Sequence, residues 1–387
     1  MTAKRFWPVA GVLLFIGIEA LLFGYSYPFF SLALESKGIA TWLIERNAAL
    51  AGAGILIFGP FLPALIDRLG LKFLVAAQFA LSFLSFAAIL AFDHLAVWFV
   101  ARFVMGTCFS ALWTTTEIWL NGVVDDRNRG RIVGASGTLY AACQFVGPLM
   151  LSATGSSGSL PLIAAMAPLA VGVAVALSIR SAVGETDEEE TGSAATLRTA
   201  LGLAGALIAA AFLTGVGETA MQSLLPLYGL AHGLSEAAAS RLVAVFSLGE
   251  AILVALLGWM ADRYGRRLTL VGCAALAVVS TLALPFVMGR GFILEPVLFI
   301  AGGTVSGLYT LGIVLIGQDF RGQRLAVVST GFAMAYSAGS VVGATPIGYL
   351  IDLFGVEALP LTVALGFLAL MAFLVRPRRR VELATED

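Results

Sequence analysis

Charged residues are scarce in this chain of 387 residues. Lys, Arg, Asp and Glu make up 12% of it, whereas a soluble domain contains roughly 25%. Hydrophobic residues account for 59%. A single water-soluble core cannot absorb so much apolar surface, so the composition predicts that the natural solvent is lipid. The net charge of −1 also argues against a nucleic-acid partner.

Residues that commonly carry catalytic or metal chemistry are few as well. The two histidines, His94 and His232, lie far apart in the sequence, and the three cysteines lie inside apolar runs without metal-ligand spacing. The nine methionines are scattered, which disfavours a soft-metal site. There is no Gly-x4-Gly-Lys phosphate loop and no suggestion of a Ser-His-Asp constellation. We therefore expect no enzymatic activity, no cofactor and no metal site.

Long hydrophobic runs are what the sequence has in abundance. A helix needs about 20 apolar residues to cross a bilayer, and twelve stretches qualify. The first contains Glu19 and lacks a small-residue cleavage pattern, so we interpret it as a membrane helix and not as a signal peptide. The predicted spans are residues 8–33, 47–66, 73–92, 95–120, 132–154, 160–180, 200–227, 240–260, 268–288, 292–316, 325–350 and 357–375.

The basic residues predict the orientation of these spans. With an even number of crossings both termini lie on one side, and most of the 23 Lys and Arg residues then lie on that side. Basic residues concentrate on the cytoplasmic side of membrane proteins, so we expect cytoplasmic termini and a multi-pass protein of the bacterial inner membrane. The acidic stretch 181–198 predicts a cytoplasmic linker. Residues 377–387 would form a cytoplasmic tail, whose basic PRRR segment at 377–380 would lie at anionic lipid headgroups.

Three landmarks recur in both halves of the chain at nearly one offset. Counting spans within each half, the first landmark is an Asp-Arg-x-Gly turn after the second span. The second is a Glu that precedes a Pro by eight or nine residues in the first span. The third is a Tyr and a Gly in the fifth span. The matched residues are Asp67 and Asp262, Glu19 and Glu218, Tyr140 and Tyr336, and Gly147 and Gly343. The repeat predicts two six-helix domains, 1–180 and 199–376. Parallel repeats of this kind are a transporter architecture with the cargo site near the midplane.

The second Asp-Arg turn carries a family resemblance. Residues 258–267, GWMADRYGRR, resemble the cytoplasmic signature of the major facilitator superfamily, in which a Gly and an Asp-Arg pair precede another Gly and two basic residues. The first copy, PALIDRLGLK at 63–72, has a Pro for the first Gly and Leu71 for a basic residue. Arg102 with Gly106 is similar to the family's fourth-helix motif. Gly147-Pro148 resembles part of its fifth-helix antiporter motif, without the trailing glycines. The resemblance implies an all-α membrane fold of twelve transmembrane helices in two pseudo-symmetric bundles.

The resemblance also implies a cytoplasmic gate that ties the halves together when the cavity faces outward. Asp67 and Asp262 would lie near helix N-termini, whose partial positive charge favours carboxylates. The alternative is that the arginines only set the topology, which would require neither the Asp nor the Gly residues. The predicted gate residues are Asp67, Arg68, Gly70, Lys72, Gly258, Asp262, Arg263, Gly265, Arg266 and Arg267.

Ionisable residues inside the spans point to a cavity. A charge at the bilayer centre costs ~2.5–3.5 kcal/mol on insertion scales, so each one needs a reason. In the resembled family the first, fourth, seventh and tenth helices line the cavity, which would bring Glu19 and Glu218 together from opposite halves. The predicted cavity is mostly apolar and aromatic with a few polar anchors, as small-molecule sites are. Its candidate residues are Glu19, Phe23, Ser26, Arg102, Trp113, Glu117, Glu218, Gln222, Glu250 and Tyr309.

Two roles compete for the buried carboxylates. Glu19 or Glu218 in apolar surroundings can carry a proton across the membrane, or Glu19 and Arg102 neutralise each other as a structural pair. Glu117, nearer the cytoplasm, is a cavity-mouth or gate residue. Glu250 either faces the cavity or pairs within the second half.

The sequence thus predicts a monomeric, proton-coupled secondary transporter that moves a small organic solute by alternating access. An exporter of amphipathic compounds fits the aromatic cavity and the pair of Glu19 and Arg102. An importer or uniporter fits the incomplete antiporter motif equally well. A sensor-like protein with an immobile core is a third alternative, disfavoured by the intact second signature and the paired Glu residues.

Overall fold

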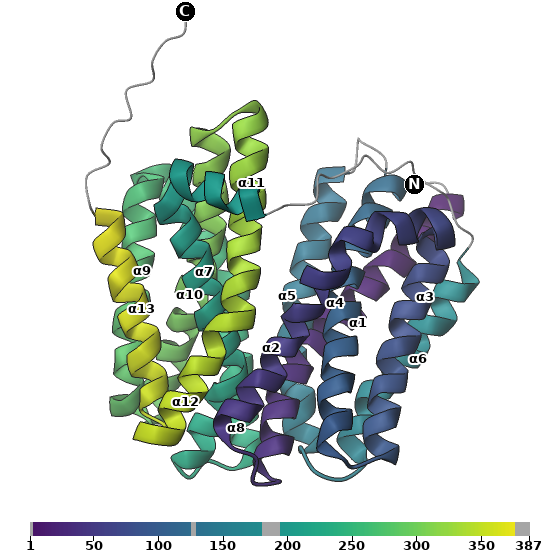
Figure 1. Ribbon diagram of the computed structural model, residues 1–387, viewed down its shortest axis with the longest axis horizontal. Helices are drawn as coiled ribbons and strands as arrows, with labels where there is room; N and C mark the ends of the chain where they lie inside the picture. The colour runs from purple at the N-terminus through teal and green to yellow at the C-terminus, as the bar shows by residue number, and fades with distance from the viewer. Residues whose placement is uncertain (1–2, 125–128, 180–193, 376–387) are drawn as a thin grey trace, which may run out of the picture.

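The computed structural model describes residues 3–124, 129–179 and 194–375, which form helices and short turns with no strand among them (Figure 1). One bundle contains α1 (Ala3–Glu35), α2 (Thr41–Phe58), the short turn η1 (Gly59–Phe61), α3 (Leu62–Ala91), α4 (Leu95–Val123), α5 (Arg129–Thr154) and α6 (Leu160–Ser178). The other contains α7 (Ala194–Ala231), α8 (Glu236–Tyr264), α9 (Arg266–Val287), α10 (Gly291–Asp319), α11 (Gly322–Ala338), the π-helical turn η2 (Gly339–Gly343), α12 (Ala344–Phe354) and α13 (Ala358–Val375).

Ten helical stretches in the described ranges are long and apolar enough to cross a membrane, and Ala358–Leu374 is apolar but shorter. The stretch Thr41–Ala91 has 51 residues, more than twice the roughly 20 that one crossing needs. It is interrupted at Gly70, whose φ of 72° and ψ of 151° are not helical and favour glycine. Gly265, between α8 and α9, has a φ of 101°. The repeated Asp-Arg-x-Gly sequence therefore breaks the helix at the same place in each half.

The same helix pairs pack in the two bundles. In the first, α1 packs on α5 and α2 on α4, and in the second, α7 packs on α11 and α8 on α10. The matched glycines explain how closely these helices approach. A Cβ on Gly147 would lie 2.4 Å from the backbone oxygen of Leu21, and one on Gly343 would lie 2.1 Å from the side chain of Val216. Small residues at crossings are how membrane helices bring their backbones together.

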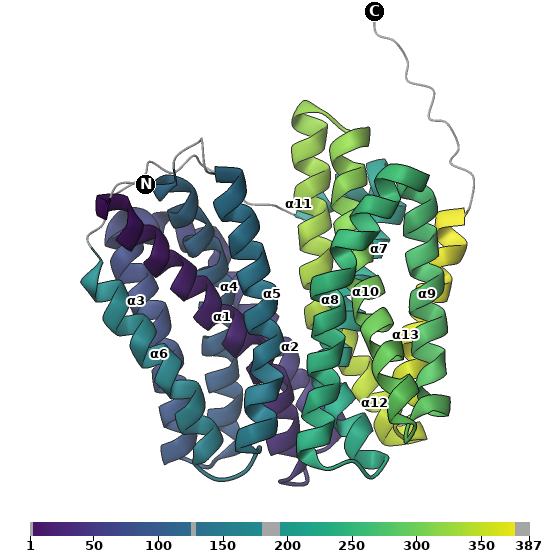
Figure 2. The same ribbon diagram turned by 180° about the vertical axis from the view of Figure 1, so that it is seen from behind.

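The bundles meet at one end and stand apart at the other. The start of α1 and the end of α13 lie at the end where the bundles stand apart, and views from both sides agree (Figures 1 and 2). We call this the termini end and the opposite one the far end. Between the bundles, α5 packs against α8 and α2 against α12.

Two predicted boundaries differ from the structure. α7 begins at Ala194, within the stretch 181–198 predicted as linker, of which residues 181–193 lie outside the described ranges, as does the tail 377–387. The second span was predicted to begin at residue 47, but α2 begins at Thr41. This earlier start places Glu45 inside a helix.

Candidate functional site

A cavity of about 110 Å³ lies between the two bundles. Side chains of α1, α2 and α4 meet there with side chains of α7, α11 and η2. Five of the predicted cavity residues line it, namely Phe23, Ser26, Arg102, Glu218 and Gln222. The other lining residues are Tyr27, Ala51, Gly52, Gly106, Phe109, Ser110, Thr219, Tyr336, Ser337 and Ser340.

Arg102 is the cationic side chain in the lining. It is 1% exposed, and its Cζ lies 4.3 Å from the ring centroid of Tyr27 and 4.9 Å from that of Phe30. The aromatic faces stabilise the charge through their quadrupoles, but they accept none of its N–H groups in ordinary hydrogen bonds. Nε and Nη2 are buried without any acceptor. The ion pairs of the described residues do not include one between Glu19 and Arg102, so the structural pair considered from the sequence is not formed here.

Glu218 is the carboxylate in the lining, and both of its oxygens are engaged. The hydroxyl of Tyr336 donates to Oε2 at 3.0 Å, and Nε2 of Gln222 donates to Oε1 at 3.4 Å. Tyr336 packs edge-on against Tyr309, with 4.9 Å between ring centroids. Tyr309, predicted in the cavity, therefore stands behind its wall and supports Tyr336.

The first bundle contains a matching aromatic pair. Trp113 packs edge-on against Tyr140 with 4.8 Å between centroids, and both residues precede their counterparts Tyr309 and Tyr336 by 196 positions. Trp113 is 46% exposed and does not line the cavity. The internal repeat has thus placed an aromatic pair beside the central cavity in each half.

Buried carboxylates converge on this region from both bundles. Tyr140 interacts electrostatically with Glu19, Glu218 and Glu250. Glu19 is 3% exposed and lies outside the cavity lining. Glu250 accepts a hydrogen bond of 3.4 Å from Gln144 of the first bundle, an arrangement that neither alternative from the sequence included.

Glu117 lies elsewhere. It is exposed, and it is not among the residues that line the cavity. It lies on α4 seven residues beyond Ser110, the last residue of that helix that lines the cavity, and its role at the mouth or gate stays a prediction.

Glu45 lies at the centre of the molecule and was not among the site residues predicted from the sequence. Its side chain is fully buried in α2, where Oε1 accepts a hydrogen bond from the hydroxyl of Ser223 in α7, across the two bundles. It also interacts electrostatically with Arg102. The neighbouring Glu45 and Arg46 looked like a loop in the sequence. The signal that was available is the long apolar run that begins directly after them.

The early start of α2 has a cause in the other half of the chain. Asp352 of α12 accepts hydrogen bonds from the backbone nitrogens of Thr41 at 3.1 Å and Trp42 at 3.0 Å. These are the orphan donors of a helix N-terminus, which a carboxylate usually caps from its own chain segment. Trp42 also stacks on Tyr349 at 5.0 Å. A cap supplied more than 300 residues away cannot be recognised from local sequence.

The internal repeat relates this contact to a second one at the far end. Glu236, at the start of α8, accepts hydrogen bonds from the backbone nitrogen of Ser156 at 3.2 Å and from its hydroxyl at 2.8 Å. Thr41 precedes Glu236 by 195 positions, and Ser156 precedes Asp352 by 196. We call the two contacts the far-end latches. Together they hold the bundles closed at the far end.

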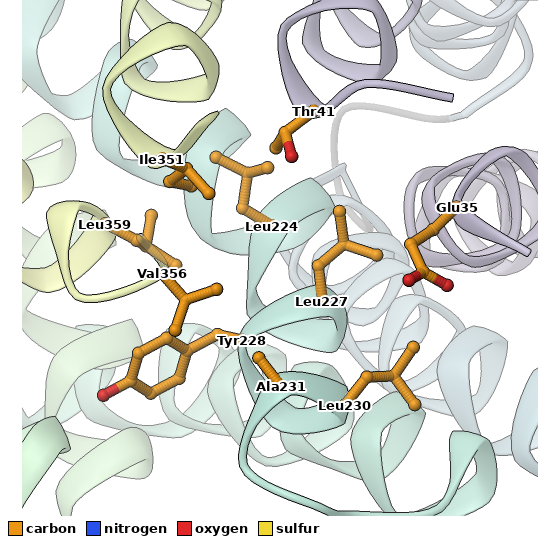
Figure 3. Close-up of a pocket in the computed structure, with 10 residues that line it drawn as sticks. All are labelled: Glu35, Thr41, Leu224, Leu227, Tyr228, Leu230, Ala231, Ile351, Val356 and Leu359. Carbon is orange, nitrogen blue, oxygen red and sulfur yellow. The ribbon is translucent and has the colours of Figure 1, made fainter. Parts of the chain in front are cut away.

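A larger cavity of about 220 Å³ lies at the far end (Figure 3). It is mostly aliphatic, with Glu35 at one edge and Tyr228 at the other. The hydroxyl of Tyr228 is already engaged with Glu357 at 3.0 Å. Its lining residues are Glu35, Thr41, Leu224, Leu227, Tyr228, Leu230, Ala231, Ile351, Val356 and Leu359. The central cavity is the stronger candidate site because only there do buried charges of opposite sign meet.

The predicted gate residues lie on the turns at Gly70 and Gly265, at the termini end. Asp67, Arg68 and Asp262 are exposed. Asp262 accepts a hydrogen bond from Arg266 of its own half at 3.2 Å. Arg267 of the same turn donates to the backbone oxygen of Leu374 at 3.1 Å, also within the second bundle.

No group of three or more His, Cys, Asp or Glu side chains in the described ranges is arranged to hold a metal ion. The lining of the central cavity contains a guanidinium, a carboxylate, tyrosines and hydroxyls. Such a lining can bind a small molecule and exchange a proton with it.

The sequence model of the Major Facilitator Superfamily matches residues 9–240 and 207–387. The chain belongs to this superfamily. It is similar to the uncharacterized MFS-type transporter YfkF of Bacillus subtilis, with 26% identity over 351 residues that cover 89% of this chain and 88% of that one. It is also similar to the uncharacterized MFS-type transporter YcaD of Escherichia fergusonii, with 24% identity over 319 residues and 80% of each chain.

Solved structures share the fold. The nucleoside transporter NupG superposes with a TM-score of 0.78 at 13% identity, over 95% of this chain and 98% of that one. A D-xylose–proton symporter superposes with a TM-score of 0.72 at 14% identity, over 95% and 97%. The protein is a multi-pass membrane transporter of the secondary type and not an enzyme.

Proposed function

We propose that this transporter moves a small organic solute together with protons, that the solute binds in the central cavity, and that Glu218 carries the proton. The observation behind the proposal is the partly buried carboxylate of Glu218, hydrogen-bonded to Tyr336, in the same cavity as Arg102. A carboxylate buried between two bundles that can part is accessible to each side in turn.

The topology follows from the broken helices. The stretch Thr41–Ala91 supplies two crossings separated at Gly70, and α11, η2 and α12 supply one. With the other helices this gives twelve crossings in two six-helix domains. The basic residues favour cytoplasmic termini in the bacterial inner membrane. The termini end is then the cytoplasmic end, and the structure is an inward-facing state.

Alternating access requires that the far end open when the cytoplasmic end closes. In the proposed cycle the far-end latches at Asp352 and Glu236 break. The turns at Asp67 and Asp262 then approach and hold the cytoplasmic ends together. The gate residues would act in the conformation opposite to this one, which accounts for their exposure here.

Transport of a bound compound tests the proposal. Metabolites and drugs that raise the unfolding temperature of the purified protein are taken into flux measurements in liposomes. A Ser110→Trp substitution fills the central cavity and should abolish flux. The matched control on the same helix is Val100→Trp, since Val100 is 63% exposed. Binding without flux in the wild type would favour a sensor, and equal flux in both variants would exclude the central cavity as the route.

A further inference from the structure

Arg102 has hydrogen-bond donors that no group in the described residues accepts. Its Nε and Nη2 are buried without an acceptor, although the side chain is 1% exposed and lines the cavity. An arginine cannot escape this cost by losing its proton, because the guanidinium stays charged in proteins. A buried charged donor without a partner is expensive. The cavity therefore holds a positive charge that lacks an acceptor.

The other charged lining residue is in the opposite situation. Each oxygen of Glu218 already accepts a hydrogen bond, from Tyr336 and from Gln222. The hydroxyl of Ser26 likewise donates to the backbone oxygen of Phe23 at 3.2 Å. The protein thus supplies donors for its own cavity carboxylate but no acceptor for its cavity guanidinium. The donors of Arg102 that lack an acceptor would be satisfied by an anion bound in the cavity.

Glu45 does not meet that demand. It interacts electrostatically with Arg102, but it lies outside the cavity lining and its Oε1 is engaged by Ser223. The Nε and Nη2 of Arg102 and the Oε2 of Glu45 are all left without a hydrogen-bond partner. The negative charge of Glu45 lowers the free-energy cost of burying Arg102. The unpartnered N–H donors of Arg102 are left for another group.

We propose that the transported solute carries a carboxylate that binds Arg102. This rests on the function proposed above and names the chemical class of its substrate. A guanidinium matches a carboxylate with two parallel hydrogen bonds. The rings of Tyr27 and Phe30 lie against its face, while Nε and Nη2 have no acceptor in the described protein. The volume of about 110 Å³ restricts the solute to a small one.

Matched pairs of probes test this in the purified, detergent-solubilised protein. Benzoate, nicotinate and lactate are each compared with the primary amide of the same skeleton, and inorganic phosphate is an additional arm. Affinity is measured from ligand-dependent thermal unfolding. We expect at least one carboxylate to bind at least tenfold more tightly than its amide. Tighter binding of phosphate than of every carboxylate would overturn the assignment of a carboxylate.

Two variants assign the preference to Arg102. Arg102→Gln should remove the preference for the acid over the amide. Arg102→Lys keeps the charge but not the paired donors, so it should retain part of that preference. Arg102→Lys also serves as the test variant if Arg102→Gln does not fold. Arg241→Gln, at an exposed position, is the control and should bind as the wild type. Equal binding of acids and amides by the wild type, or an undiminished preference in both Arg102 variants, would overturn the proposal. Carboxylate binding that depends on Arg102 but without flux in liposomes would instead refute the proposed function and leave the anion site standing.

Discussion

The hydroxyl of Tyr336 donates a 3.0 Å hydrogen bond to Oε2 of Glu218, and this bond joins two helices of the second bundle inside the central cavity. The repeat places Tyr140 at the equivalent position of the first bundle. Tyr140 makes no hydrogen bond to a carboxylate within the described residues, although it lies within electrostatic range of Glu19. The symmetry of the fold is therefore broken at the carboxylate that we assign to the proton.

A Tyr336→Phe substitution should destabilise the protein, because it leaves an oxygen of the partly buried Glu218 carboxylate without its donor. Such a loss costs about 1–3 kcal/mol. Tyr140→Phe removes the equivalent hydroxyl without breaking such a bond and is the matched control. Unfolding temperatures of the two variants in detergent should differ, with Tyr336→Phe lower. Equal decreases in unfolding temperature would show that the hydrogen bond between Tyr336 and Glu218 does not add to the stability of the protein.

Breaking a far-end latch should shift the protein toward the opposite conformation. Asp352→Asn removes the charge that caps α2 from the other bundle, and loss of a helix cap costs about 0.5–2 kcal/mol. This corresponds to a change of about 2- to 30-fold in the ratio of conformations. Reaction of Leu230→Cys, in the far-end cavity, with a water-soluble maleimide should accelerate accordingly.

Asp93→Asn is the control for this experiment. Asp93 is also an acidic residue near the far end, but its partner Lys37 belongs to the same bundle. The maleimide rate should therefore stay unchanged in this variant. If Asp93→Asn accelerates the reaction as much as Asp352→Asn, the effect is one of surface charge and not of a latch.

The pair of Lys37 and Asp93 gives a small dependence of stability on pH. Hydrogen bonds from Lys37 at 2.6 and 2.7 Å lower the pKa of Asp93. A carboxyl with a lowered folded-state pKa adds stability above its unfolded pKa of about 4. That stability is lost as the pH falls through the folded value. Because the pair is exposed, we expect less than about 1 kcal/mol. Lys37→Gln should flatten this part of the stability curve measured by thermal unfolding between pH 3 and 6, roughly the range in which a carboxyl titrates.

The crossing of α1 and α5 should not tolerate a methyl group at Gly147. A Cβ there would lie 2.4 Å from the backbone oxygen of Leu21, which cannot move aside as a side chain could. Overpacking of this kind costs about 1–3 kcal/mol. Gly137→Ala on the same helix meets nothing within 4 Å and should be neutral or stabilising. Similar unfolding temperatures for the two alanine variants would contradict the close crossing.

The sequence was sufficient for the features that a repeat and hydropathy can reveal. Apolar runs identified the membrane helices, and both Glu218 and Arg102 were among the predicted cavity residues. The matched landmarks predicted that Glu19 would face Glu218, but Glu19 lies outside the cavity lining. What the sequence could not show depends on contacts across the halves. Asp352 caps α2 from the other bundle, so the helix began earlier than local sequence indicated and Glu45 was taken for a loop residue. Tyr309 lies on α10, the tenth helix, which the family resemblance made a cavity helix. No residue of α10 is among those that line the central cavity here, and Tyr309 packs against Tyr336 instead.

Proton movement driven by the solute is the most direct test of the proposed mechanism. A pH-sensitive dye inside liposomes would report protons while a gradient of a transported compound is applied. We expect the wild type to change the internal pH, with the sign separating symport from antiport. Glu218→Gln should lose this change, and Glu295→Gln, altered at an exposed residue outside the cavity lining, should keep it. Solute flux without any pH change in the wild type, or an undiminished change in Glu218→Gln, would contradict proton coupling through Glu218.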